Sequence, residues 1–295
     1  MLALIQGLRE FVADLTGPNG VFLQHALIAG LAASVAFGIM GTYVVAKRIS
    51  MLAGAIAHSA LGGIGAAHYL QAKAGLEWFQ PLHGALAAAL LSAFLIGIVT
   101  LYAREREDTI ISAIWVTGMS LGIILLKLSG AKSVDMMSYI IGDILLVSPS
   151  DLWLILALDA LVVTLAIVFY HKFVAICFDQ EFAELRGIKV HVYNFLMLAL
   201  VAISIILLSR LVGIILVIAL IVLPSAFAAR FANRLSVMMI LSILACMIFV
   251  SSGIALSYPY ELPSGACIAA VAAASYFLLL TSKAAWKKVA SLSRR

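Results

Sequence analysis

The chain has 295 residues, of which 64% are hydrophobic and only 11% charged, and its mean hydropathy is +1.15. A soluble domain carries about 25% charged residues, so the composition excludes an ordinary soluble protein and indicates a polytopic integral membrane protein. The formal charge of +5 does not indicate a nucleic-acid partner, because the basic residues lie in short connections and at the C-terminal end, where they set membrane orientation.

The chain opens on residues 1–20, which carry several charges and no basic region ahead of an apolar run. This pattern predicts an interfacial segment rather than a cleaved signal peptide. Nine apolar runs of roughly 17 to 25 residues follow, and each is long enough to cross a bilayer core. They are 21–46, 51–70, 82–103, 109–128, 152–170, 192–209, 211–229, 235–257 and 263–282.

A shorter run, 136–147, contains Gly142 and Asp143 and ends before Ser148 and Pro149. Its length and its polar residues predict a re-entrant or interfacial segment rather than a full crossing. The predicted fold class is therefore all-α, a polytopic integral membrane protein with about eight to nine transmembrane helices and one short re-entrant or interfacial segment.

Basic residues occur in every second connection of this arrangement. They are Lys47, Arg48, Arg104, Arg106, His171, Lys172, Arg186, Lys189, Arg230 and Arg234. Because positive residues mark the cytoplasmic side, these connections and the basic tail 283–295 are predicted to face the cytoplasm. The transmembrane domain then extends over 21–282, with no separate soluble domain.

His58 stands in the middle of 48–67, an apolar segment rich in Gly and Ala. An ionisable side chain inside a span costs free energy, so it marks an ion or substrate path unless it serves helix packing. The small residues around it allow neighbouring helices to approach closely. This segment alone leaves both interpretations open, a path residue or a packing histidine hydrogen-bonded to a neighbour.

Two motifs that would indicate an enzyme are missing from the sequence. It contains no G-x-x-x-x-G-K-[S/T] loop to hold nucleotide phosphates and no H-E-x-x-H zinc motif. We therefore expect that the chain is not an enzyme, does not hydrolyse ATP itself and binds no permanent cofactor. An intramembrane hydrolase would need a nucleophile and a base that the sequence does not place.

The longest polar connection, residues 177–194, alternates acidic with apolar residues. The residues at helical spacing are Glu181, Phe182, Glu184 and Leu185. They predict a short amphipathic helix that ends near Gly187, where glycine suits a C-terminal cap. Such a helix either lies in a groove of a cytoplasmic partner or simply joins two spans.

Three residues inside or between the runs need separate interpretations. Asp159 lies about a third of the way into its run, where a carboxylate must be paired or face water, so it serves either structure or transport. Asp143 is a candidate for the outer end of a path, since non-helical backbone at membrane depth is tolerated where it lines water. Pro224 interrupts helical hydrogen bonding within its run, as a gate hinge or as an aid to packing.

Five stretches carry a family likeness that extends from about residue 20 to residue 282. They are RISMLAGAIAHSALGGIGAA (48–67), YAREREDTIISAIWVTGMSLGI (102–123), FDQEFAELRGIKV (178–190), LVGIILVIALIVLPSAFAARF (211–231) and YPYELPSGACI (258–268). With these stretches, the chain resembles the membrane permease subunit of ABC-type zinc/manganese importers.

The resemblance implies a function and a set of partners. Residues 21–282 would form the permease domain, and 178–190 would be the cytoplasmic segment that couples it to a separate ABC ATPase subunit. An extracytoplasmic metal-binding protein would deliver Zn²⁺ or Mn²⁺, and a second permease subunit, forming a homodimer, would complete the path. The expected location is the prokaryotic cytoplasmic (inner) membrane.

The sequence departs from the family pattern next to His58. Family members commonly show G-D-x-x-x-H, with a carboxylate four residues before the histidine on the same helix face. Gly54 occupies that position here. His58 therefore carries over as a metal-path residue, whereas a complete Asp/His site does not. Imidazole is an ordinary zinc ligand and Mn²⁺ prefers oxygen, so the change favours zinc.

We interpret the sequence as the permease of an ATP-driven divalent metal importer, with His58, Asp143 and Asp159 as metal-path residues. The alternative is a secondary metal transporter driven by an ion gradient, in which Asp159 and His58 relay protons. An associated ATPase subunit would support the first interpretation and would be unexplained by the second.

Overall fold

The computed structural model describes residues 9, 11–15, 17, 20–102, 107–130 and 149–292. The run 136–147, with Asp143, lies outside these ranges. The elements in chain order are α2 (Val21–Ala46), α3 (Ser50–Ala74), α4 (Pro81–Tyr102), α5 (Glu107–Ser129), α7 (Pro149–Val168), α8 (Tyr170–Phe178), α9 (Gln180–Leu185), α10 (Val190–Val212), α11 (Ile214–Ala228), α12 (Leu235–Ser257), the 3-10 helix η2 (Tyr258–Tyr260) and α13 (Ser264–Leu292).

Each of the nine apolar runs corresponds to a helix, so the all-helical, multi-pass fold class is confirmed. Among the described residues, six helices are long and apolar enough to cross a membrane, or seven if the bent pair α7–α8 counts as one span. Helices α10 and α11 are apolar as well. The 15 residues of α11 extend about 22 Å at 1.5 Å per residue, which is less than the roughly 30 Å of a bilayer core.

The polar connection between the apolar runs 152–170 and 192–209 contains two helices, α8 and the predicted short helix α9. Helix α8 is bent by 70° from α7. It buries Phe173 and Ile176, which are three residues apart and so share one helix face. The Phe173 ring meets the edge of Tyr43 on α2 at a centroid distance of 5.4 Å. This buried face holds α8 against the bundle.

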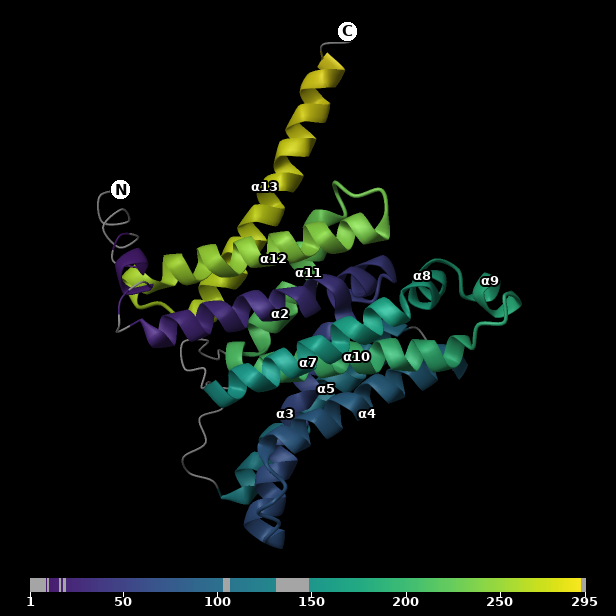
Figure 1. Ribbon diagram of the computed structural model, residues 1–295. Coiled ribbons are helices and arrows are strands. Elements are labelled where there is room, and N and C mark those ends of the chain that lie inside the picture. The colour runs from purple at the N-terminus through teal and green to yellow at the C-terminus, as the bar shows by residue number, and fades with distance from the viewer. Residues whose placement is uncertain are drawn as a thin grey trace.

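Two lysines tie the helices together at the α8–α9 end of the bundle. Lys47, after α2, donates a hydrogen bond to the side-chain oxygen of Asn194 on α10. Lys172 on α8 donates to the hydroxyl of Tyr193. Figure 1 shows the end of α2, the α8–α9 segment and the α11–α12 connection at the same end. The basic connections that these segments carry therefore share one side, as the positive-inside pattern predicts.

The described part of the N-terminal segment 1–20 lies at the opposite end, beside η2 (Figure 1). Residues 11–15 are helical. The Tyr258 hydroxyl donates a hydrogen bond to the carboxylate of Asp14. Phe11 packs edge-on against the Tyr258 ring at a centroid distance of 5.8 Å. These contacts fix the entry of the chain into α2.

Helix α3 lies between α4 and α5 and approaches both at glycines. A Cβ atom at Gly65 would lie 2.3 Å from the carbonyl oxygen of Gly122 on α5, and one at Gly118 would lie 2.6 Å from the Cα of Ser59. On the α4 side, a Cβ at Gly63 would lie 1.9 Å from the carbonyl oxygen of Gly84. Only hydrogen fits at these positions, so the backbones of the three helices are in direct contact.

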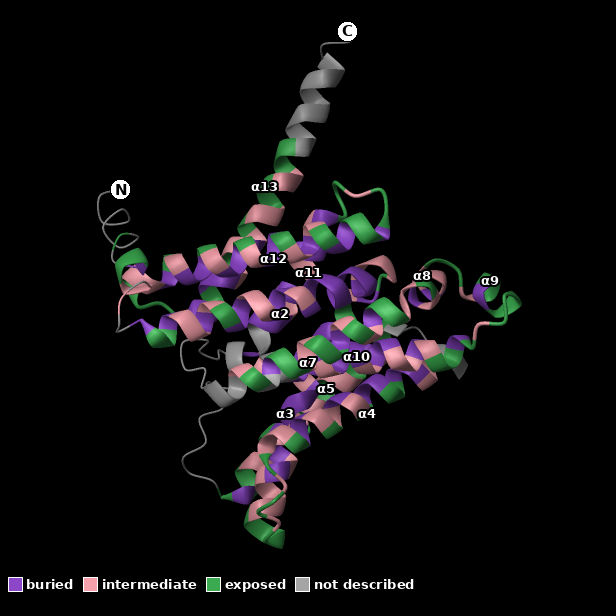
Figure 2. Ribbon diagram, viewed as in Figure 1, coloured by how far each residue is buried: buried purple, intermediate pink, exposed green. Residues whose placement is uncertain are grey.

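Burial is uneven among the helices, as Figure 2 shows. Helix α2 has the largest buried share of the six candidate spans, and it packs against α7, α11 and α12. Helix α5 is mostly exposed and rests chiefly on α3. On α13, none of the described side chains from residue 273 to 282 is buried. The interior of the single chain is therefore centred on α2, and the α3–α4–α5 group forms a second layer beside it.

The glycine contacts lead to a test of packing. Gly118→Leu should destabilise the permease by about 1–3 kcal/mol or more, because the added side chain meets the backbone of α3, which cannot move aside. Ser120→Leu is the matched control, since residue 120 is exposed on the same helix. Thermal unfolding of both variants in detergent measures the difference. Equal stability of the two variants would contradict the tight α3–α5 contact.

The orientation is tested by labelling across α12. In a variant without Cys177, Cys246 and Cys267, a membrane-impermeant thiol reagent added outside should modify Glu261→Cys and leave Arg234→Cys unlabelled, because basic connections face the cytoplasm. Labelling of the Arg234 position alone would reverse the predicted topology.

Candidate functional site

The His58 side chain lies on α3 and faces α5, where it stacks on Trp115. The two rings are nearly parallel, with an interplanar angle of 11° and a centroid distance of 4.6 Å. His58 is half-buried. Its Nδ1 atom is buried and has no hydrogen-bond partner among the described residues. The packing alternative, a histidine hydrogen-bonded to a neighbour, therefore finds no partner for Nδ1 in the described part of the chain.

Gly54 lies one turn before His58 and touches the same indole. A Cβ atom at position 54 would lie 3.3 Å from Cζ3 of Trp115. The space next to His58, where a side chain four residues earlier would project, is therefore bordered closely by the Trp115 ring. Gly54 itself supplies no ligand.

Asp159 lies on α7, which packs against α2 and, less closely, against α10. Its side chain is half-buried, and its Oδ2 atom is buried without a hydrogen-bond partner among the described residues. Within the described ranges, no group of three or more His, Cys, Asp and Glu side chains is placed to hold a metal ion. Among the described residues, the structure thus does not assemble His58 and Asp159 with a third ligand into a closed metal site; Asp143 lies outside the described ranges.

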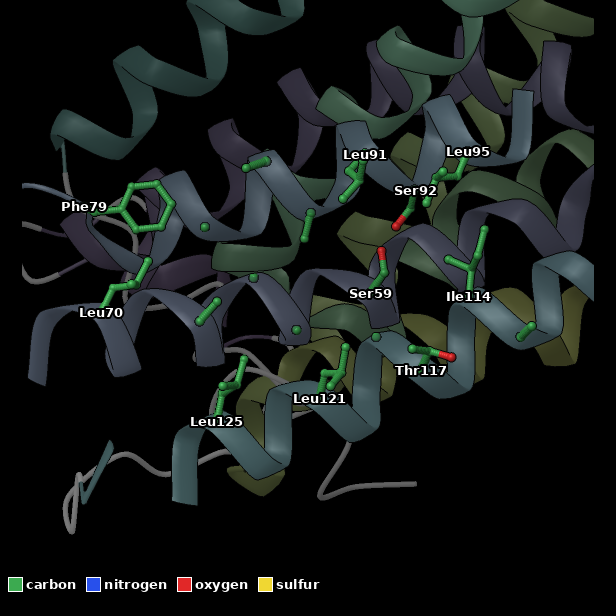
Figure 3. Close-up of a pocket in the computed structure, with 18 residues that line it drawn as sticks. Ser59, Leu70, Phe79, Leu91, Ser92, Leu95, Ile114, Thr117, Leu121 and Leu125 are labelled. Atoms are coloured by element: carbon green, nitrogen blue, oxygen red, sulfur yellow. The ribbon is translucent and has the colours of Figure 1, made fainter. Parts of the chain in front are cut away.

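A groove of about 590 Å³ opens between α3, α4 and α5. Its wall consists mainly of Gly, Ala and Leu, and the polar side chains that line it are Ser59, Ser92 and Thr117. Figure 3 shows the hydroxyls of Ser59 and Ser92 pointing toward one another across the groove. Ser59 already donates a 2.8 Å hydrogen bond to the Ile56 carbonyl. With so few polar groups, the groove offers poor ligands to a divalent cation, which prefers charged oxygen or imidazole donors.

The segment 178–190 forms the short helix α9, as predicted, and the helix ends at Leu185. The carboxylate of Asp179 caps its first turn by accepting a 2.9 Å hydrogen bond from the Phe182 backbone N–H. Gly187 follows with φ of +76°, a left-handed conformation that glycine adopts without strain. Both ends of α9 are thus fixed by local sequence.

The large apolar side chains of α9 are exposed. Leu185 is 87% exposed and Phe182 48% exposed. Ala183 alone is buried, against Ile176 of α8 and Val190 of α10. Glu184 lies 3.8 Å from His191, but both side chains are more than half exposed, so the pair contributes little to stability. The helix therefore presents an apolar surface outside the permease.

Pro224 lies inside α11, near its C-terminal end. Its ring removes one helical hydrogen bond. The next residue, Ser225, shares a 2.7 Å hydrogen bond with Ser242 on α12, and Gly41 on α2 approaches the Ile221 carbonyl. The proline thus sits in a closely packed region between α2 and α12, and the role of a gate hinge stays a prediction.

Trp115 has no signal of its own in the sequence, because an aromatic residue in an apolar run is typical of a packed core. A second feature of α5 does have a visible signal. Gly118 and Gly122 form a G-x-x-x-G pattern, which is typical of close helix contact in membranes, and both touch α3. The letters of 118–122 also match G-x-S-x-G. A nucleophile elbow needs a turn between strand and helix, whereas this segment lies within α5.

Comparison with known proteins places the chain in a family. The model of the ABC 3 transport family matches residues 20–283. The chain is 37% identical to a probable metal transport system membrane protein of Chlamydia pneumoniae over 263 residues, which are 89% of each protein. It is 30% identical to the manganese transport system membrane protein MntC of Halalkalibacterium halodurans, covering 87% of this chain and 86% of MntC.

A solved structure gives the same result for the fold. PsaBC from Streptococcus pneumoniae, in complex with Fab, contains a chain that is 28% identical to this one and matches it with a TM-score of 0.78. The match covers 92% of this chain and 94% of the other. Because the family model spans nearly the whole transmembrane region, the resemblance in the sequence is confirmed: the chain belongs to the ABC 3 transport family, as a multi-pass membrane permease without catalytic function.

Proposed function

We propose that the chain is the permease subunit of an ATP-driven importer of divalent metal ions and that His58 lies on the path of the ion. Family membership supports ATP-driven transport over the secondary-transporter alternative, and the names of the relatives support a metal as the transported substrate. The observation that carries the proposal is the half-buried imidazole of His58 inside a span, whose buried Nδ1 has no hydrogen-bond partner among the described residues, so that no neighbour accounts for it as a hydrogen-bonded packing histidine. Imidazole is a common ligand of divalent transition metals.

Two copies of the chain would complete the path. A twofold interface brings the same surface of both subunits together, and we propose that this surface includes His58, so that its two copies face each other across the axis. Two imidazoles and water would make a weak, open site, and a transported ion must leave its site as readily as it enters. This arrangement agrees with the lack of a closed three-ligand group in the described part of one chain. Asp143 and Asp159 remain proposed residues of the same path.

ATP hydrolysis in a separate subunit would act on the permease through α9. The exposed Phe182 and Leu185 form the apolar face of a short helix at the basic, cytoplasmic end. An apolar helix face of this kind fits a hydrophobic groove on a partner. Glu181, Glu184 and Gly187 belong to the same coupling segment and would shape its polar side and its end. An extracytoplasmic metal-binding protein would deliver Zn²⁺ or Mn²⁺ at the opposite end.

The coupling proposal predicts the effect of a charge at position 185. Leu185→Asp should leave the permease folded and abolish ATP-driven metal uptake, because a carboxylate in an apolar groove loses its hydration without gaining a partner. Lys189→Gln changes the net charge by the same amount at an exposed site of the segment and should transport normally. Co-purification of the ATPase and uptake into proteoliposomes are measured for both variants. Normal uptake by Leu185→Asp would contradict docking through α9.

The path proposal predicts the effect of removing the imidazole. His58→Ala should lower uptake of Zn²⁺ and Mn²⁺ by about tenfold or more. Even removal of a residue that only hydrogen-bonds to a metal ligand lowers metal affinity or activity about 10- to 100-fold. Dimer assembly should be retained. His83→Ala, which removes an exposed histidine, is the control and should transport normally. Uptake by His58→Ala at the unaltered rate would assign His58 to packing and move the path to Asp143 or Asp159.

A further inference from the structure

The indole of Trp115 contacts both His58 and Gly54. These contacts bear on how the His58 ring is oriented. A metal-binding histidine usually has its second ring nitrogen hydrogen-bonded to a carboxylate or carbonyl, which fixes the orientation of the ring. Nδ1 of His58 has no such partner among the described residues. The near-parallel indole of Trp115, at 4.6 Å, is the contact that holds the imidazole plane instead.

The same indole also controls which ligand can stand beside the imidazole. A side chain at position 54 would begin 3.3 Å from Cζ3 of Trp115, with Cη2 at 3.6 Å and Cε3 at 3.8 Å. An aromatic face carries negative electrostatic potential, so it repels a carboxylate and attracts a cation. A carboxylate at position 54 would therefore suffer both close contact and electrostatic repulsion.

We propose that Trp115 is the positioning residue of His58 and a determinant of ion specificity. By stacking on the imidazole and covering Gly54, it keeps the path rich in imidazole and free of carboxylate at this level of the membrane. Such a path favours metal ions of intermediate softness such as Zn²⁺, which bind imidazole well, over Mn²⁺, which prefers oxygen ligands. This inference rests on the proposed role of His58 in metal transport.

The test uses the complete importer, permease with its ATPase, reconstituted in proteoliposomes, and measures initial uptake of Zn²⁺ and Mn²⁺ separately. Trp115→Leu removes the stacked face and should raise the KM for Zn²⁺ about tenfold with a smaller change in kcat, as expected for a lost orienting partner. Trp115→Phe keeps an aromatic face and should stay close to the parent. Assembly of each variant is checked by size-exclusion chromatography.

A second set of variants separates specificity from packing. Gly54→Ala adds only a methyl group and should leave the ratio of Mn²⁺ to Zn²⁺ uptake unchanged. Gly54→Asp alone should transport poorly, because its carboxylate meets the indole. In Gly54→Asp with Trp115→Leu, the carboxylate gains room beside His58, and the Mn²⁺ to Zn²⁺ ratio should rise about tenfold above that of Trp115→Leu alone. If Trp115→Leu fails to assemble, Gly54→Asp with Trp115→Met, which also lacks an aromatic face, provides the same comparison.

The outcomes distinguish this inference from the proposed function. If His58→Ala loses uptake while Trp115→Leu keeps its KM and the double variant keeps the ion ratio of Trp115→Leu, Trp115 is a packing residue and the present inference is wrong. If His58→Ala also transports normally, the metal-path role of His58 fails as well. A changed ion ratio in the double variant, with Gly54→Ala unchanged, supports both.

Discussion

Close backbone contact between α3 and its two neighbours is the constraint on which the site depends. Apolar helices in a membrane gain little by leaving lipid for each other, because lipid tails are as apolar as leucine side chains. Their association depends on van der Waals contact over a large area, and α3 achieves it with Gly63 against Gly84 and Gly65 against Gly122. A methyl group at these positions would separate the helices and with them the His58–Trp115 stack.

This packing also assigns different tasks to adjacent residues of α3. Successive residues are about 100° apart around a helix. Ser59 therefore enters the apolar groove between α4 and α5, while His58 turns toward the Trp115 indole. The groove is an apolar space with few groups that could bind a metal ion. The side of α3 that carries His58 presents an imidazole stacked on an aromatic ring. The geometry thus separates a lipid-like surface from the polar group that we assign to the ion.

The two proposed functional regions are joined by continuous contacts. Helix α9 rests through Ala183 on α8 and α10, and Lys47 ties the end of α2 to Asn194 of α10. The connection from α2 to α3 is tight, with Arg48 in the left-handed conformation at φ of +63°. A displacement of α9 by an ATPase would therefore act on packed elements that lead directly into the helix of His58. Packed contacts of this kind are one route by which coupling between distant sites is carried.

The sequence by itself determined that this is a polytopic membrane protein, where its long helices lie and that α9 is a short helix. Apolar runs in a membrane must form helices, because lipid offers no partner for backbone N–H and C=O groups. Asp179 and Gly187 likewise set the ends of α9 through bonds within a few residues. Both kinds of information are local, so composition and spacing were enough to predict them.

Only the tertiary structure decided what His58 contacts. Trp115 lies 57 residues further along the chain, and nothing in the local pattern says which face of α5 meets α3. The bend between α7 and α8, and the burial of Phe173 against Tyr43, were hidden for the same reason. Hydropathy specifies that a segment is helical and apolar, whereas its partner depends on small shape differences between surfaces that are all apolar. The ring on which the imidazole rests is therefore a property of the packed bundle and not of the segment.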